Sequence, residues 1–223
     1  MSATTAVSHV IAIDGPAASG KSSVARRVAE RLGWTFVNTG NMYRAITWAV
    51  IQRGIDPCDT AAVANIAATL LIDFKTTDGQ TSICIDGHLP GPELTGDAVN
   101  RAVSLVAAVP AVRERLVSGQ RSLALLGSLV MEGRDIGSVV FPDAAFKFYI
   151  DASEEVRSAR RQAQGHTDKV AERDRLDTTR KNSPLVTAAD AVVIDSSEMT
   201  LDEVVERVLS VLRSRGLAQS SAW

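Results

Sequence analysis

The chain has 223 residues, of which 45% are hydrophobic and 22% are charged, and this composition predicts one soluble globular domain with room for a small insertion. A formal net charge of −2 excludes the strong positive field that attracts nucleic acid or an anionic membrane. Cys58 and Cys84 form no CxxC pair or histidine cluster, which argues against a zinc site. Residues 1–9 lack a signal-peptide pattern and no apolar stretch could span a membrane, so we expect a cytoplasmic protein.

The first elements of the chain follow the order strand, glycine-rich loop, helix, strand, helix. Residues 9–14 are a short apolar run, typical of a buried parallel strand, and residues 20–33 carry apolar side chains at helical spacing. Residues 35–40 predict a second strand, and residues 41–54 predict a second helix that ends at a glycine. This order predicts an α/β fold in which helices flank a parallel five-stranded sheet.

The middle of the chain departs from that alternation. Residues 71–87 place Asp78-Gly79 between two strand-like runs, which is the signal of a β-hairpin. A helix is expected before this hairpin, and two more are expected over residues 90–126. A hairpin and helices within a series of strand–helix units predict an inserted subdomain over residues 60–105.

The last part of the chain returns to the strand–helix order. Strands are expected within residues 128–141, 145–153 and 189–197, the first of them followed by a polar turn. The highly charged residues 154–182 predict two helices, and residues 200–216 predict a closing amphipathic helix.

The segment from Gly15 to Ser22 matches the pattern G-x-x-x-x-G-K-[ST], with a predicted strand before it and a predicted helix after it. Backbone N–H groups of such a loop point into one concavity, and the helix dipole adds to its attraction for phosphate. Lys21 is expected to reach the β- and γ-phosphates, and the Ser22 hydroxyl is expected to ligate Mg²⁺. The loop therefore predicts a nucleoside triphosphate site.

Further arginines follow the predicted strands. Arg44 lies early in the helix after the second strand, and Arg134 and Asp135 follow the strand that ends near residue 133. Loops at the carboxyl ends of adjacent parallel strands face one crevice, so Arg44 is expected to meet a second phosphate near the first loop. The alternative for these residues is a solvated helix position or an ordinary ion pair.

A third cluster lies in the charged segment. Arg173, Asp177 and Arg180 occupy positions i, i+4 and i+7, which share one helix face. That face would present two guanidinium forks and a carboxylate to one target, although a salt-bridged surface helix would show the same pattern. The arginines just upstream are Arg157, Arg160 and Arg161.

Together these clusters predict two anionic substrates bound face to face, because phosphoryl transfer depends on positioning and electrostatic stabilisation. We see no dedicated general base, and a phosphate acceptor needs none because it is already an anionic nucleophile. A regulatory P-loop switch would carry NKxD and DxxG motifs, and the chain has neither. A nucleotide sensor without catalysis stays open as an alternative.

The segments NTGNMYRA, EGRDIGSVVFPDA, ERDRLDTTR and AADAVVIDSS, together with the phosphate loop, resemble the bacterial cytidylate kinases in that order. The resemblance covers most of residues 8–212. It implies one P-loop kinase domain over residues 1–223, with a monophosphate-binding insertion at 60–105 and a lid at 157–173. It also implies Mg²⁺-assisted transfer of the γ-phosphoryl group of ATP to CMP or dCMP. From the lack of an exposed apolar stripe we expect a monomer.

The resemblance also implies roles for individual residues. ATP would contact Gly15, Pro16, Ala17, Ala18, Ser19, Gly20, Lys21, Ser22, Ser23, Arg157 and Arg161. CMP would contact Thr39, Tyr43, Arg44, Ser104, Arg113, Arg134, Asp135, Arg173, Asp177 and Arg180. The catalytic residues would be Lys21, Arg134, Arg173 and Arg180, and the metal ligand would be Ser22.

Base recognition in this scheme depends on Ser104, Arg113 and Asp135. Cytosine offers acceptors at N3 and O2 for Arg113, and its N4 amino group is a donor for Asp135. Uracil would turn a carbonyl oxygen toward that carboxylate, so UMP is expected to be a poor substrate. A kinase for UMP or AMP remains the alternative within the same class.

The chain departs from the family pattern in three places. Ala18 stands where the family usually has glycine, and its Cβ is tolerable there only if the local φ is negative. The insertion reads GPELTGDAV and lacks a usual arginine, and the lid segment is shorter than usual.

Overall fold

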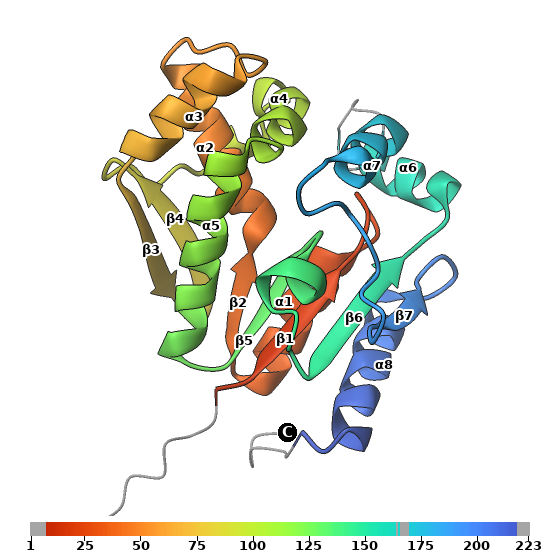
Figure 1. Cartoon of the computed structure of the whole chain (residues 1–223). Helices are drawn as coiled ribbons and strands as arrows, with labels where there is room; N and C mark the ends of the chain where they lie inside the picture. The colour runs from red at the N-terminus through yellow and green to blue at the C-terminus, as the bar shows by residue number, and fades with distance from the viewer. Residues whose placement is uncertain (1–7, 164, 166–169, 218–223) are drawn as a thin grey trace, which may run out of the picture.

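Figure 1 shows the protein as a computed structural model that describes residues 8–163, 165 and 170–217. Within these residues the centre is a seven-stranded sheet in the order β3-β4-β2-β5-β1-β6-β7. The strands are β1 (Val10–Asp14), β2 (Thr35–Asn38), β3 (Ile72–Thr77), β4 (Gln80–Ile85), β5 (Leu129–Gly133), β6 (Phe146–Asp151) and β7 (Val192–Asp195). All neighbouring strands pair in parallel except β3, which is antiparallel to β4. The predicted α/β class is confirmed, but the sheet has seven strands where five were expected.

The two additional strands are those of the predicted hairpin. Asp78 and Gly79 have φ values of 50° and 71°, as a two-residue hairpin turn of type I′ requires. The hairpin then joins the sheet, because β4 pairs with β2 through Phe36↔Gln80 and Val37↔Thr81. The residues of a strand do not indicate which distant strand it pairs with. The sequence therefore predicted the hairpin but not its place in the sheet.

Helices cover both faces of the sheet (Figure 1). They are α1 (Lys21–Leu32), α2 (Thr39–Gln52), α3 (Thr60–Thr69), α4 (Asp97–Ala107), α5 (Pro110–Leu123), α6 (Glu154–Ala163), α7 (Val170–Thr179) and α8 (Leu201–Ser214). Short 3₁₀ turns at Pro92–Thr95 and Ala124–Leu126 and a π-helix at Ile136–Val140 complete the described elements. None of the helices in the described ranges is long and apolar enough to cross a membrane.

Two apolar cores lie on opposite faces of the sheet. Ile11 and Ile13 of β1 pack with α1 and α8, whereas Ala12 between them packs with α2 and α5. All three side chains are fully buried, which explains why this strand is a continuous apolar run rather than an alternating one. The sheet is therefore a central layer between two layers of helices.

The carboxyl ends of the parallel strands meet at one edge. Asp14, the last residue of β1, is in register with Gly133 of β5, and Asn38 of β2 is in register with Glu132. The phosphate loop follows β1 directly, so this register places the loop beside the segment EGRD. Residues more than 100 positions apart in the sequence are thus brought to the same edge.

Candidate active site

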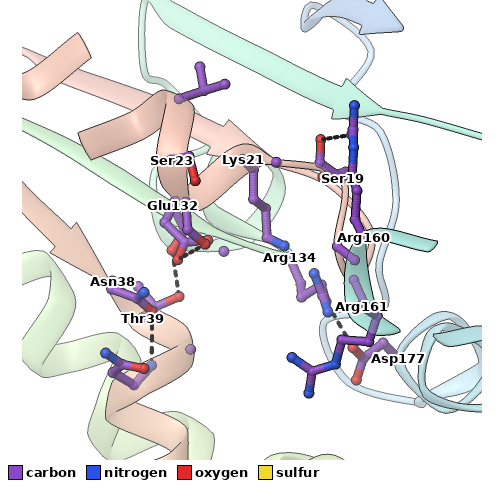
Figure 2. A pocket seen from close by; sticks show the side chains of 18 of the residues that line it. Ser19, Lys21, Ser23, Asn38, Thr39, Glu132, Arg134, Arg160, Arg161 and Asp177 are labelled. Atoms are coloured by element: carbon purple, nitrogen blue, oxygen red, sulfur yellow. Dashed lines mark hydrogen bonds and ion pairs between the residues drawn. The ribbon is translucent and has the colours of Figure 1, made fainter. Parts of the chain in front are cut away.

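A cavity of about 720 Å³ opens at that edge of the sheet. The phosphate loop, α2, α4 and α5 contribute to its lining, and so do α6, Asp177 of α7 and the segment before α8. Figure 2 shows Lys21, Glu132, Arg134 and Asp177 gathered around the cavity. Groups from both halves of the chain therefore face one space.

Most of the predicted site residues lie on this cavity. Those in its lining are Ala17, Ala18, Ser19, Gly20, Lys21, Ser22, Ser23, Thr39, Tyr43, Arg44, Ser104, Arg113, Arg134, Asp135, Arg161, Asp177 and Arg180. Gly15, Pro16 and Arg157 lie outside the lining. Arg173 lies on α7, and its side chain falls outside the part of the chain that the structure describes.

The backbone of the phosphate loop requires glycine at two positions, Gly15 and Gly20. A Cβ on Gly15 would lie 2.1 Å from the carbonyl oxygen of Ile150, so only glycine fits at this position. Gly20 has φ 92° and forms the N-cap of α1, whose first turn is capped by no side chain. Lys21 is 8% exposed and donates to the carbonyl oxygen of Pro16 at 2.9 Å. The helix N-terminus and a buried ammonium group thus face the cavity, as phosphate binding requires.

Ala18 contradicts the expectation that a Cβ at this position is tolerable only with a negative φ. Its φ is 59°, in the left-handed region that glycine normally occupies. For an L-residue with a Cβ this conformation costs roughly 1–2 kcal/mol, and contacts elsewhere must offset the cost. The loop therefore keeps the curvature typical of glycine despite the alanine.

Glu132 is a site residue that the motif search did not single out. Its side chain is buried at the end of β5, and its Oε1 accepts a hydrogen bond from the Ser22 hydroxyl at 2.8 Å. A hydroxyl and a carboxylate are oxygen ligands of the kind that Mg²⁺ prefers. The described residues contain no group of three or more acidic, histidine or cysteine side chains that could hold a metal. A magnesium ion here would take its remaining ligands from water and substrate phosphates.

Arg134 and Arg180 meet at Asp177. Arg134 Nε donates to Asp177 Oδ2 at 2.8 Å, and Arg180 Nη1 lies 3.6 Å from Asp177 Oδ1. Burial disfavours the charged form of Arg134, but the charge and hydrogen bond of Asp177, together with the charges of Asp174 and Glu132, raise its pKa. Arg134 Nη1 also donates to the carbonyl oxygen of Gly15 at 2.6 Å. The guanidinium group of Arg134 therefore joins α7 to the phosphate loop.

The wall formed by α2 carries further polar groups. Thr39 Oγ1 donates to the carbonyl oxygen of Glu132 at 2.8 Å, and Arg44 lines the cavity beside it. Burial raises the pKa of Tyr43 to about 12, so its hydroxyl remains a proton donor at neutral pH. Nη2 of Arg180 is buried without a hydrogen-bond partner among the described residues. An anion on this wall would satisfy such donors.

Arg113 and Asp135 form a buried ion pair, with side chains 5% and 4% exposed. The guanidinium carbon of Arg113 lies 5.2 Å from the centre of the Tyr43 ring, in a cation–π contact. Ser104 of α4 donates to Asp177 Oδ1 at 3.2 Å, which links α4 to α7. The three residues expected to recognise the base thus share one wall of the cavity.

Asp14 supports the turn that carries Arg134 and Asp135. Its two carboxylate oxygens accept hydrogen bonds from the backbone N–H groups of Ile136 and Gly137, each at 2.8 Å. Burial raises the pKa of Asp14 to about 7, although these two hydrogen bonds act in the opposite direction. The role of Asp14 was not visible in the sequence, because its partners lie more than 120 residues away.

A second group of residues beside the phosphate loop joins Arg160, which was expected in the lid, to a segment after β7 that was not predicted. Arg160 donates to the Ser196 hydroxyl at 3.0 Å and to the Ser19 carbonyl oxygen at 3.3 Å. Ser196, Met199 and Leu201 follow β7 and line the same cavity. No phosphate-binding motif marks this segment, and only the position of β7 in the sheet brings it to the loop.

A family model and the curated relatives point to the same family. A family model described as "Cytidylate kinase" matches residues 11–214. The cytidylate kinase of Pelotomaculum thermopropionicum is 46% identical over 212 residues, which cover 90% of this chain and 94% of the relative. That of Rhodococcus opacus is 46% identical over 220 residues, 93% of this chain and 96% of the relative. That of Geobacillus kaustophilus is 42% identical over 216 residues, with coverage of 92% and 96%.

Proposed function

The chain belongs to the cytidylate kinase family and phosphorylates CMP and dCMP, and we propose that ATP and the acceptor occupy opposite sides of the one cavity. One observation carries this proposal. The phosphate loop supplies Lys21 and the N-terminus of α1, while Arg44, Arg134 and Arg180 line the same cavity. Two sets of phosphate-binding groups in one space suit the transfer of a phosphoryl group between two phosphates.

The donor side consists of the phosphate loop and the start of α1. ATP would place its triphosphate against the backbone N–H groups of this turn, with Lys21 beside the β- and γ-phosphates. Ser22 and Glu132, joined by a hydrogen bond of 2.8 Å, would hold Mg²⁺ between them and the phosphates. When bound, the ion neutralises charge that develops on the β- and γ-phosphate oxygens.

The acceptor side consists of α2, the loop after β5 and the end of α7. The monophosphate of CMP would bind Thr39, Tyr43, Arg44, Arg134 and Arg180, all of which line the cavity. One of its oxygens forms a bond to the γ-phosphorus, while the bond from that phosphorus to the β–γ bridging oxygen breaks. The arginines stabilise the charge on the transferred group, which is the main contribution that a protein makes to this reaction. Asp177 and Arg173 would reach the sugar.

The acceptor base would be read by the buried pair Arg113 and Asp135, together with Ser104. Asp135 accepts from the exocyclic amino group of cytosine, and Arg113 donates to its ring acceptors. Tyr43 below Arg113 keeps the guanidinium plane in place. A uracil ring would leave the Asp135 carboxylate facing a carbonyl oxygen, which is repulsive in a buried site.

These assignments also define the roles of two segments of the chain. Residues 60–105 would form the acceptor-binding insertion, with Ser104 at its end, and residues 157–173 would form a short lid over ATP. We propose that the protein acts as a monomer in the cytoplasm.

The proposal is tested by measuring ADP formation in a coupled assay with CMP, dCMP, UMP and AMP as competing acceptors. CMP and dCMP should be used with a kcat/KM at least about tenfold above the other two, as one hydrogen-bonded base contact provides. Equal use of UMP would contradict the assigned roles of Arg113 and Asp135.

A further inference from the structure

The peptide group on each side of Ala17 in the phosphate loop is held by the same pair of side chains. The backbone N–H of Ala17 donates to Asp174 Oδ1 at 2.9 Å, and its carbonyl oxygen accepts from Arg157 Nη1 at 3.2 Å. Asp174 lies on α7 and Arg157 on α6, and the two side chains form an ion pair with each other. These contacts bring two helices against the first half of the loop.

The side chains of Arg157 and Asp174 are largely buried and hydrogen-bonded in this arrangement. Arg157 Nε donates to the carbonyl oxygen of Ala152 at 3.0 Å, so its guanidinium group is occupied on two edges. The side chains of Arg157 and Asp174 are only 11% and 14% exposed. Neither residue belongs to the lining of the cavity. Arg157 is therefore positioned to support the loop from behind rather than to contact ATP.

The residue next to Ala17 explains why support is required. Ala18 has φ 59°. An alanine populates this backbone conformation about tenfold less than an unstrained one. A loop with an alanine here would relax to a negative φ unless its neighbours prevented it. Relaxation would turn the following N–H groups away from the cavity.

We propose that the Asp174–Arg157 pair is a positioning device, which holds the phosphate loop in its nucleotide-binding conformation against the strain at Ala18. The pair acts on ATP only through the loop. The inference rests on the proposed role of this loop in binding ATP. Because apparent affinity scales with the fraction of protein in the competent conformation, loss of the pair weakens ATP binding and spares the acceptor site.

The first test is the variant Asp174→Ala, which removes both the acceptor for Ala17 and the partner of Arg157. We expect the KM for ATP to rise by about tenfold and the KM for CMP to change by less than about twofold. Asp174→Asn, which keeps an oxygen for the Ala17 N–H, should show a smaller increase. The control is Glu154→Gln, which removes an exposed carboxylate from α6, the helix that carries Arg157, and should change neither constant.

The second test is a rescue by Ala18→Gly, since glycine adopts a positive φ without strain. In the Asp174→Ala background, Ala18→Gly should lower the KM for ATP most of the way back to the wild-type value. In the wild-type background the same change should lower this KM by a smaller factor than in the Asp174→Ala background, because the pair already holds the loop. Equilibrium binding of a fluorescent ATP analogue without CMP should show the same pattern.

Two results would overturn the inference. One is an unchanged KM for ATP in Asp174→Ala, and the other is an equal effect of Ala18→Gly in both backgrounds. Thermal unfolding verifies that each variant is folded. If Asp174→Ala does not fold, Asp174→Asn takes its place as the test variant. Failure of the proposed function is seen separately, because Lys21→Ala would then still transfer phosphate.

Discussion

The Ser22 hydroxyl donates to Glu132 Oε1 at 2.8 Å, and this bond joins the start of α1 to the end of β5. The two residues are 110 positions apart, and the parallel pairing of β1 with β5 brings them together. Glu132 is 3% exposed, so a carboxylate at this depth is stable only with a polar or cationic partner.

The first prediction concerns this carboxylate. In Glu132→Gln the Mg²⁺ concentration for half-maximal rate should rise by about tenfold, because a neutral amide is a weaker partner for a divalent cation. A titration with MgCl₂ at fixed concentrations of ATP and CMP measures this half-maximal concentration. Glu30→Gln, which changes an exposed glutamate on α1, is the matched control. An unchanged magnesium requirement would remove Glu132 from the proposed metal site.

The second prediction concerns Lys21. The variant Lys21→Ala should lose about a thousandfold or more in kcat/KM, since a positive charge beside the transferred group is lost from a buried site. The fold should persist, because the Lys21 side chain lines the cavity and belongs to neither of the two apolar cores. Far-UV circular dichroism and thermal unfolding verify the fold. Retention of wild-type turnover would mean that the loop has only a structural role.

The third prediction concerns the base. In Asp135→Asn the side-chain amide can donate to the O4 carbonyl of uracil, so the ratio of kcat/KM for CMP to that for UMP should fall by about tenfold or more. The ratio is informative even if the variant is less stable, because both substrates report on the same folded fraction. Some loss of stability is expected, since Arg113 would lose its buried partner. If the ratio stays constant while both rates fall, Asp135 does not read the base.

The fourth prediction concerns pH and Asp14. Burial raises the pKa of this carboxyl from 3.8 to about 7, so between about pH 4 and pH 7 the folded protein binds more protons at Asp14 than the unfolded chain. The contribution of Asp14 to the free energy of unfolding is therefore full below pH 4 and is lost as pH rises through 7. Urea unfolding at pH 5, 6, 7 and 8 should show this decline in the wild type.

Asp14→Asn removes the titrating group and provides the comparison. Its free energy of unfolding should change less with pH over the same range, because an amide does not ionise. The Asn side chain can accept only one of the two N–H groups that Asp14 holds, so the variant should also be less stable near pH 5. Parallel pH profiles of the two proteins would show that Asp14 does not titrate in this window.

Much of the site could be predicted from residues that are close together in the sequence. Gly15, Gly20, Lys21 and Ser22 lie in one short segment, so their spacing alone identifies the phosphate loop. Asp78 and Gly79 identified the hairpin for the same reason, since a turn depends on the backbone of adjacent residues. Arg44 and Arg134, which follow strands in the sequence, line the cavity because parallel strands end at a common edge.

What the sequence by itself determined is therefore local: the phosphate-loop motif, a series of strand–helix units and the arginines that follow the strands. Only the tertiary structure decided that the hairpin extends the sheet to seven strands, that Glu132 meets Ser22, and that Asp174 and Arg157 hold Ala17. It also decided that Ala18 keeps a left-handed backbone. The physical reason is common to all four findings. Each depends on contacts between distant segments, and such contacts are set by strand order and packing rather than by the residues on either side.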